Sequence, residues 1–158
     1  MRFKKLIAFG ALISTLLFSC NFNDPQITKF SLSSVYYEKA ELAEVTKEEF
    51  NDLLTAKDSF IIYQYLESCM ACYQFTPVLN EFILDQEITV LKINAFSGGE
   101  TILKNYATIV PTLFLFEKGG YVTHLDPTKS EHAGAFTSAS GLTLWLEKYV
   151  NLAAPTSE

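Results

Sequence analysis

The sequence predicts a single α/β domain, and three observations lead to that prediction. The chain has 158 residues, which is the length of one ordinary domain once a short leader is set aside. Hydrophobic residues make up 49% and aromatic residues 14% of the chain, so it is too apolar to be disordered and can bury one sizeable core. From Ser59 onward, strand-like and helix-like segments follow one another in the order βαβαββ.

Charge and glycine content exclude several classes of protein. The formal net charge of −6 disfavours nucleic-acid backbones and anionic lipid headgroups as partners. Loss of a leader that carries Arg2, Lys4 and Lys5 makes the remaining chain more acidic. The 7 glycines and 5 prolines follow no fixed period, which excludes collagen-like and solenoid architectures. We therefore expect no nucleic-acid partner.

Residues 1–19 have the character of an export signal. Three cations are followed by an uncharged apolar run, 6–18, that is shorter than the roughly 20 residues a transmembrane helix needs. The run ends in Leu17-Phe18-Ser19-Cys20, which resembles a bacterial lipobox, where a signal peptidase cuts before a diacylated cysteine. The alternative is a plain secretory signal followed by an incidental cysteine.

A lipid on Cys20 predicts a protein anchored on the extracytoplasmic face of a cell membrane, because two or three acyl chains hold a protein where one does not. The polar residues that follow predict a flexible tether over 20–34. We expect the folded domain over 35–152 and a C-terminal tail over 153–158.

Local patterns predict the elements of the domain in order. Partial alternation indicates a strand over 34–45, and Thr46-Lys47-Glu48-Glu49 has the spacing of a capping box before a helix over 47–57. An apolar, β-branched run predicts a buried strand over 59–66. The further expectations are a helix over 72–85 kinked at Pro77, a strand over 89–95, a helix over 100–107, a strand over 112–116, a hairpin turn over 117–120 into a strand over 121–125, a surface loop over 126–140 and a closing helix over 141–152.

With Cys20 lipidated, Cys69 and Cys72 remain as a pair in a compartment where disulfides persist. They lie where a buried strand gives way to a helix. The positive end of the helix favours a thiolate, so we expect the pKa of the Cys69 thiol to fall below its usual value of roughly 8.5. Cys72 lies three residues on and should be less exposed. One sulfur can then attack a substrate disulfide while the other resolves the mixed disulfide.

Other uses of the two cysteines are open at this point. A structural staple would close a loop too short to constrain the unfolded chain much. Zinc needs about four ligands, and His124 and His132 have the wrong spacing for a finger. Copper(I) favours thiolates, so a non-enzymatic domain that binds copper or a peptide is the alternative to redox catalysis.

Several motifs together resemble the thioredoxin superfamily over residues 42–150. They are the Cys69-Met70-Ala71-Cys72 motif after a strand, Pro77 five residues beyond Cys72, Val110-Pro111-Thr112 before an apolar strand, and the Lys118-Gly119 hairpin. The resemblance implies a thioredoxin-like fold, with a central mixed β-sheet flanked by helices. It also implies catalysis by Cys69 and Cys72 without a cofactor, a cis peptide bond at Pro111 facing the dithiol, and substrate binding by the backbone of Val110.

The chain departs from the thioredoxin pattern in ways that leave open its substrate and the reduction potential of its cysteine pair. Ser68 and Ala71 stand where thioredoxins have tryptophan and proline, and Tyr63 occupies the position of a buried acid. A phenol is a poor base at neutral pH. Glu67 and Lys92 are candidates for relaying the proton of the Cys72 thiol through water. The alternative is that both are simply charges that face solvent. The segment 126–140 is longer than its thioredoxin counterpart. It is either a lip over the active site or a tolerated insertion.

The sequence thus predicts an extracytoplasmic, lipid-anchored thiol:disulfide oxidoreductase. Its expected partners are the thiols and disulfides of exported proteins or peptides, a membrane redox partner, and the membrane itself through Cys20. It also resembles accessory oxidoreductases of bacteriocin export. The direction of electron flow is left open.

Overall fold

The structure is a computed structural model that describes residues 28–96 and 101–155. The predicted export signal, Cys20 and the residues up to 27 lie outside this range, as do 97–100 and 156–158. Within the described residues, no helix has both the length and the apolar character needed to cross a membrane.

A mixed five-stranded sheet forms the centre of the domain, with strand order β2-β4-β3-β5-β6. The strands β2, β4 and β3 run parallel to one another, whereas β5 and β6 are antiparallel to their neighbours. The bounds are β2 (Glu41–Glu44), β3 (Phe60–Tyr65), β4 (Thr89–Asn94), β5 (Thr112–Glu117) and β6 (Gly120–Leu125). This is the thioredoxin-like α/β fold that the sequence predicts.

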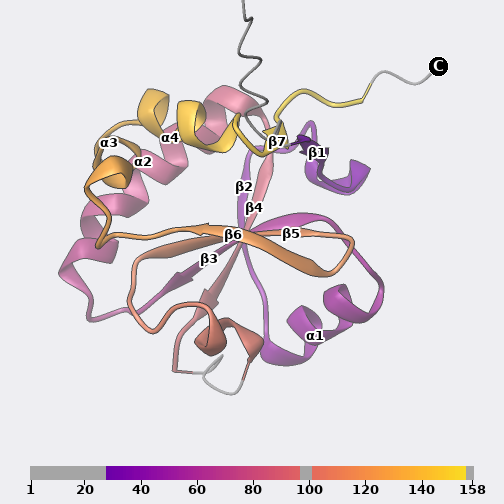
Figure 1. The fold of residues 1–158 in the computed structure, drawn as a ribbon, viewed down its shortest axis with the longest axis horizontal. Helices are drawn as coiled ribbons and strands as arrows, with labels where there is room; N and C mark the ends of the chain where they lie inside the picture. The colour runs from indigo at the N-terminus through magenta and orange to yellow at the C-terminus, as the bar shows by residue number, and fades with distance from the viewer. Residues whose placement is uncertain (1–27, 97–100, 156–158) are drawn as a thin grey trace, which may run out of the picture.

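Helices cover both faces of this sheet. Figure 1 shows α2, α3 and α4 gathered on one side and α1 on the other. The bounds are α1 (Lys47–Thr55), α2 (Met70–Gln86), α3 (Ala133–Thr137) and α4 (Ala139–Leu146), with short 3-10 turns η1 (Ser34–Tyr36), η2 (Ile102–Asn105) and η3 (Ser130–His132). The predicted capping box before α1 is present, because Thr46 accepts from the Glu49 amide and the Glu49 carboxylate accepts from the Thr46 amide.

The core fills both faces of the central strand β3. Side chains of a strand alternate between faces, so Phe60 and Tyr63 point in opposite directions. Phe60 stacks on Phe116 at a centroid distance of 5.0 Å, and both rings meet Phe50 of α1 edge-on. On the other face, the Tyr63 ring lies 5.6 Å from Phe75 of α2. Burial of both faces therefore fixes β3 and the start of α2 relative to each other.

The segment 126–140 is not the surface loop that the sequence predicts. It contains η3, α3 and the first residues of α4. Alanine and glycine dominate α3, so its sequence carries little hydrophobic periodicity. The short helix is stabilised by packing instead: Ala135 is buried, and the Phe136 ring lies 5.0 Å from Phe75.

Two further predictions are wrong at their C-terminal ends: the closing helix over 141–152 and the tether over 20–34. The helix α4 stops at Leu146, and the chain continues into β7 (Val150–Asn151). This strand pairs in parallel with β1 (Phe30–Ser31), where Phe30 and Val150 are both buried. The folded part therefore begins before residue 35, through a pairing between two distant parts of the sequence that no local pattern indicates.

Two further expectations differ in detail. The strand predicted over 34–45 is a 3-10 turn, η1, followed by β2, which begins only at Glu41. The Tyr36 and Tyr37 side chains are buried here through hydroxyl hydrogen bonds to Asp58 and to the Asn151 carbonyl, rather than by alternation along a strand. The helix predicted over 100–107 is the 3-10 turn η2.

Candidate active site

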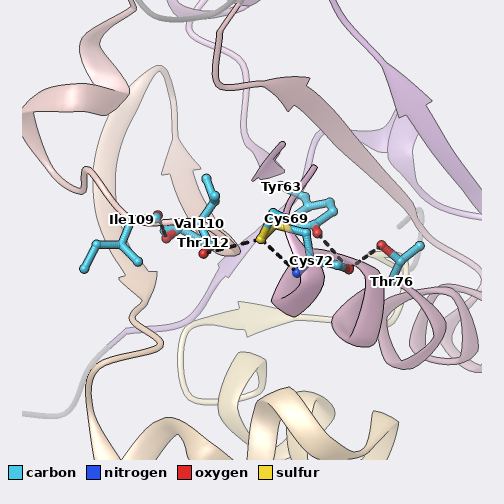
Figure 2. Close-up of a disulfide and its surroundings, with 7 residues drawn as sticks. All are labelled: Tyr63, Cys69, Cys72, Thr76, Ile109, Val110 and Thr112. Carbon is cyan, nitrogen blue, oxygen red and sulfur yellow. Dashed lines mark hydrogen bonds between the residues drawn. A yellow bond between two sulfur atoms is a disulfide. The ribbon is translucent and has the colours of Figure 1, made fainter. Parts of the chain in front are cut away.

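The cysteine pair lies where β3 passes into α2, and the two residues form a disulfide. Their Cα atoms are 5.2 Å apart. Cys69 is the N-cap residue of α2, with an extended backbone, and Cys72 lies in the first turn of the helix. Figure 2 shows both sulfur atoms at this helix end, facing the segment that precedes β5. The predicted placement at a strand–helix junction is confirmed.

The helix end gives the two sulfurs different surroundings. The backbone N–H of Cys72 donates a hydrogen bond to Sγ of Cys69, with the nitrogen 3.1 Å from the sulfur. This N–H belongs to the first turn, where amide groups lack helical partners and the helix dipole is positive. Cys72 is only 3% exposed, whereas Cys69 is half-buried. The outer sulfur is therefore the more accessible of the two, and an amide is directed at it; the lowered pKa of the reduced Cys69 thiol stays a prediction.

A proline faces the disulfide from the segment before β5. The Val110–Pro111 peptide bond is cis, as the resemblance implies. The carbonyl oxygen of Val110 lies 3.8 Å from Sγ of Cys69. Behind it, the hydroxyl of the fully buried Thr112 donates to the Ile109 carbonyl at 2.6 Å. Val110 is thereby held beside Sγ of Cys69, with backbone groups that an extended peptide could meet (Figure 2).

Tyr63 lies beneath the first turn of α2. Its hydroxyl donates to the carbonyl oxygen of Cys72 at 3.4 Å, and the Thr76 hydroxyl donates to the same oxygen at 2.8 Å. Burial raises the pKa of Tyr63 to about 12. The phenol is therefore neutral at physiological pH and acts as a hydrogen-bond donor. It cannot accept the proton of Cys72 as a carboxylate at this position could.

The two candidates for a proton relay lie in different places. Lys92 on β4 directs its ammonium group to the Glu44 carboxylate at 3.3 Å, and this group lies 5.2 Å from the centre of the Tyr65 ring. Glu67 is exposed and lines a hollow of about 280 Å³ together with Cys69. Of the two, only Glu67 lines the same hollow as Cys69. The relay itself stays a prediction for both residues.

Sequence reasoning missed two apolar side chains at the site. Met70 and Tyr73 in the first turn of α2 are 70% and 78% exposed, and both line the hollow beside Cys69. Ile109, across the site, is 48% exposed. Exposed apolar side chains that are grouped, as Met70 and Tyr73 are in one hollow, mark contact surfaces more than single ones do. The signal was available, because Met70 and Tyr73 fall on the helix face opposite Phe75 and Leu79.

A second hollow opens on the other side of the cysteines. It has a volume of about 310 Å³ and lies between the start of α2, Pro111 and α3. Its lining residues are Ala71, Gln74, Phe75, Pro111, Pro127, Ala133, Phe136 and Thr137. The segment 126–140 thus borders the site. This favours the interpretation that the segment is a lip over the site, rather than a tolerated insertion.

Neither histidine lies with the cysteines. Nδ1 of His124 is 2.6 Å from the Tyr121 hydroxyl, and Nδ1 of His132 accepts from the Asp126 amide at 2.9 Å. Burial lowers the pKa of His124. Among the described residues, no group of three or more histidine, cysteine and acidic side chains is placed to hold a metal ion.

Comparison with solved structures finds thioredoxins of low sequence identity. A mutant thioredoxin from Halobacterium salinarum is 21% identical, with a TM-score of 0.56 over 73% of this chain and 96% of that protein. Mitochondrial thioredoxin 3 from Saccharomyces cerevisiae, in its oxidised form, is 18% identical, with a TM-score of 0.51 over 67% and 93%. Thioredoxin O1 from Arabidopsis thaliana, also oxidised, is 22% identical, with a TM-score of 0.51 over 68% and 96%.

The curated proteins contain no match to this sequence. The thioredoxin family model, in contrast, matches residues 41–136. This range holds the whole five-stranded sheet, both cysteines and the cis proline. The chain belongs to the thioredoxin family.

Proposed function

We propose that this protein is an extracytoplasmic thiol:disulfide oxidoreductase that acts on exported proteins or peptides. The observation that carries the proposal is the Cys69–Cys72 disulfide, with one sulfur accessible at a helix N-terminus and facing the cis Val110–Pro111 bond. A permanent staple gains nothing from a partly exposed sulfur or from an amide directed at it. Exchange chemistry needs both.

The exchange proceeds in two steps. In the reduced protein, the Cys69 thiolate attacks one sulfur of a substrate disulfide, so that the substrate S–S bond breaks, a mixed disulfide forms and one substrate thiolate leaves. The Cys72 thiol then loses its proton and attacks Cys69, which releases the second substrate thiolate and forms the Cys69–Cys72 disulfide. Two electrons pass from protein to substrate. The same steps in reverse oxidise a substrate dithiol.

The surroundings assign distinct tasks to the two sulfurs. The Cys72 amide stabilises the attacking or leaving thiolate of Cys69, whereas burial keeps Cys72 from reacting with external disulfides. The proton of Cys72 leaves through water or Glu67, because the Tyr63 phenol is protonated throughout the working range. A membrane redox partner would restore the starting state of the pair after each turnover.

The location follows from the lipobox-like Leu17-Phe18-Ser19-Cys20. The first described strand begins at Phe30, and the residues between Cys20 and Phe30 reach at most about 35 Å when fully extended. A lipid on Cys20 would therefore keep the dithiol near the bilayer, where newly exported chains emerge. Tethering raises its effective concentration toward membrane partners.

The first prediction separates the roles of the two cysteines. Cys69→Ser should reduce insulin disulfides no faster than buffer does, because the attacking sulfur is gone. Cys72→Ser should still attack but stall, so that a mixed disulfide between protein and substrate accumulates and is visible on a non-reducing gel. A wild-type protein that is no faster than Cys69→Ser would contradict the proposal and favour a binding role.

The second prediction concerns Tyr63. Because its pKa of about 12 keeps the phenol protonated, it gains or loses no proton between about pH 6 and pH 9. Tyr63→Phe should leave the shape of the pH–rate profile of disulfide reduction unchanged. Tyr65→Phe, which removes a hydroxyl bonded to Glu44, is the matched control. An inflection lost only in Tyr63→Phe would show that the phenol does transfer the proton.

The third prediction concerns the anchor. Expressed in a bacterium, the wild-type protein should yield an N-terminal peptide that starts at Cys20 and carries acyl chains, as mass spectrometry would detect. An inhibitor of the lipoprotein signal peptidase should leave the precursor uncut, whereas Cys69→Ala should be processed normally. Cleavage at another position, or an unmodified Cys20, would contradict the proposed lipid anchor.

A further inference from the structure

We propose that the reduced cysteine pair and Met70 together form a binding site for one copper(I) ion. Its ligands are the thiolates of Cys69 and Cys72 and the thioether sulfur of Met70. The site goes beyond the proposed exchange function, because it binds a metal ion and transfers no electrons. It also opposes that function, since a metal-bound pair has no free sulfur with which to attack a disulfide.

All the sulfur in the described part of the chain lies in this one place. The full sequence has 3 cysteines and 2 methionines, and Met1 and Cys20 precede the first described residue. The other sulfur-bearing residues are Cys69, Met70 and Cys72, at the start of α2. Thiolates and thioethers are soft ligands, and copper(I) is an ion that prefers such ligands. The set of donor atoms therefore already points to one class of metal.

The Met70 side chain lies outside the core and is accessible to an ion. It is 70% exposed, although it begins a helix whose inner face is buried through Phe75 and Leu79. It lines the hollow of about 280 Å³ that Cys69 also lines. A polarizable thioether beside a thiolate is thus available to a metal ion without any rearrangement of the core.

The backbone keeps the two cysteines close together when the disulfide is reduced. Their Cα atoms are 5.2 Å apart, a separation that the first turn of α2 sets. Cys72 is only 3% exposed, so the ion approaches from the hollow beside Cys69. The Cys72 N–H that is directed at Sγ of Cys69 offsets part of the negative charge of the two thiolates. Both sulfurs can therefore bind one ion at the end of the helix.

The surroundings favour copper(I) over zinc and over calcium or magnesium. Zinc sites have about four ligands, often with histidine, but His124 is hydrogen-bonded to Tyr121 and His132 to a backbone amide. Calcium and magnesium require several oxygen ligands, and among the described residues that line the hollow Glu67 alone is acidic. The third ligand of the proposed site is a thioether, a ligand typical of copper.

No positive charge opposes the entry of a metal ion on the described side of the hollow. Its described lining has no lysine or arginine and consists of Glu67, Ser68, Cys69, Met70 and Tyr73. The ammonium group of Lys92 is directed at the Glu44 carboxylate, 3.3 Å away. The Glu67 carboxylate attracts a cation toward the sulfur atoms, even though oxygen is a poor ligand for copper(I).

Binding exchanges protons for a metal ion. The thiols of Cys69 and Cys72 each release a proton, both thiolates and the Met70 sulfur form bonds to copper(I), and the metal keeps its oxidation state. The pair must be reduced first, because a disulfide has no thiolate to offer. Copper(II) is not the bound form, since two copper(II) ions would take two electrons from the thiolates and leave the disulfide and copper(I).

The test uses the full chain with Cys20→Ser in every sample, which removes the third thiol, after reduction and without oxygen. Copper(I) is supplied as its coloured complex with bathocuproine disulfonate, whose absorbance falls as the protein takes the ion. The variants are Cys69→Ser and Met70→Leu, which replaces the thioether by an aliphatic side chain. Tyr73→Leu changes another exposed side chain of the same hollow and is the matched control.

We expect one copper(I) ion per protein, and loss of this binding in Cys69→Ser. Met70→Leu should weaken the apparent affinity by roughly tenfold or more, because one ligand is gone, whereas Tyr73→Leu should bind as the unsubstituted protein does. In protein labelled with selenomethionine, X-ray absorption should show a copper–selenium contact that Met70→Leu abolishes. Circular dichroism checks that the variants are folded.

A second readout is the attack of the reduced protein on insulin disulfides in a single turnover. One equivalent of copper(I) should stop this reaction. A copper-bound protein that reacts as fast as the metal-free protein would overturn the claim that the metal occupies both sulfurs.

Failure of the copper site and failure of the exchange function are distinguishable. The site is overturned, while exchange stands, if Cys69→Ser takes up copper(I) as well as the unsubstituted protein does. Equal affinity in Met70→Leu, or the absence of a copper–selenium contact, also overturns the three-sulfur site. If the metal-free protein reduces insulin no faster than Cys69→Ser does, the exchange function fails, and copper(I) uptake then decides the site by itself.

Discussion

The hydrogen bond from the Cys72 amide to Sγ of Cys69 is the contact on which the rest of the site depends. It exists because Cys69 is the residue that begins α2, and this in turn requires β3 to end at Tyr65. The strand is held on both faces, by Phe50 on one side and Phe75 on the other. The core of the domain thus fixes the position of one sulfur atom.

Around this contact, the site combines an amide that would stabilise a Cys69 thiolate with features that leave the reduction potential open. Stabilising the thiolate of Cys69 favours the reduced pair and hence an oxidising enzyme. Met70 and Ala71 replace the usual residues between the cysteines, and Tyr63 replaces the buried acid with a neutral donor. The exposed side chains of Met70 and Tyr73 provide apolar surface where the tryptophan of thioredoxins is missing. The chain therefore keeps the cysteine pair of the family and differs in the surface around it.

The features that could be predicted from the sequence are those with a local pattern. The capping box of α1, the buried strand β3 and the cysteines at the start of α2 are each specified within a few residues. Pro111 lies opposite the cysteines although it is far from them in the sequence. This placement could be predicted only because several motifs together resemble one family. The cis bond and the contact of Val110 with Cys69 agree with it.

The features that could not be predicted depend on contacts between distant segments. The pairing of Phe30 with Val150 leaves no pattern in either segment, so local patterns predict a tether over 28–34 and a helix over 147–152. The short helix α3 is held by the packing of Phe136 on Phe75 and has little hydrophobic periodicity, so local patterns predict a loop there. This helix also lines the second hollow beside the cysteines, so the local pattern does not indicate every wall of the site.

The most direct test of the account is the redox equilibrium of Cys69 and Cys72 against glutathione buffers, followed by thiol labelling and mass spectrometry. A catalytic pair should convert reversibly between dithiol and disulfide, with a two-electron midpoint between about −270 and −120 mV, the range of thioredoxin-like oxidoreductases. A pair that stays oxidised at potentials down to about −300 mV would behave as a structural disulfide and would contradict the account.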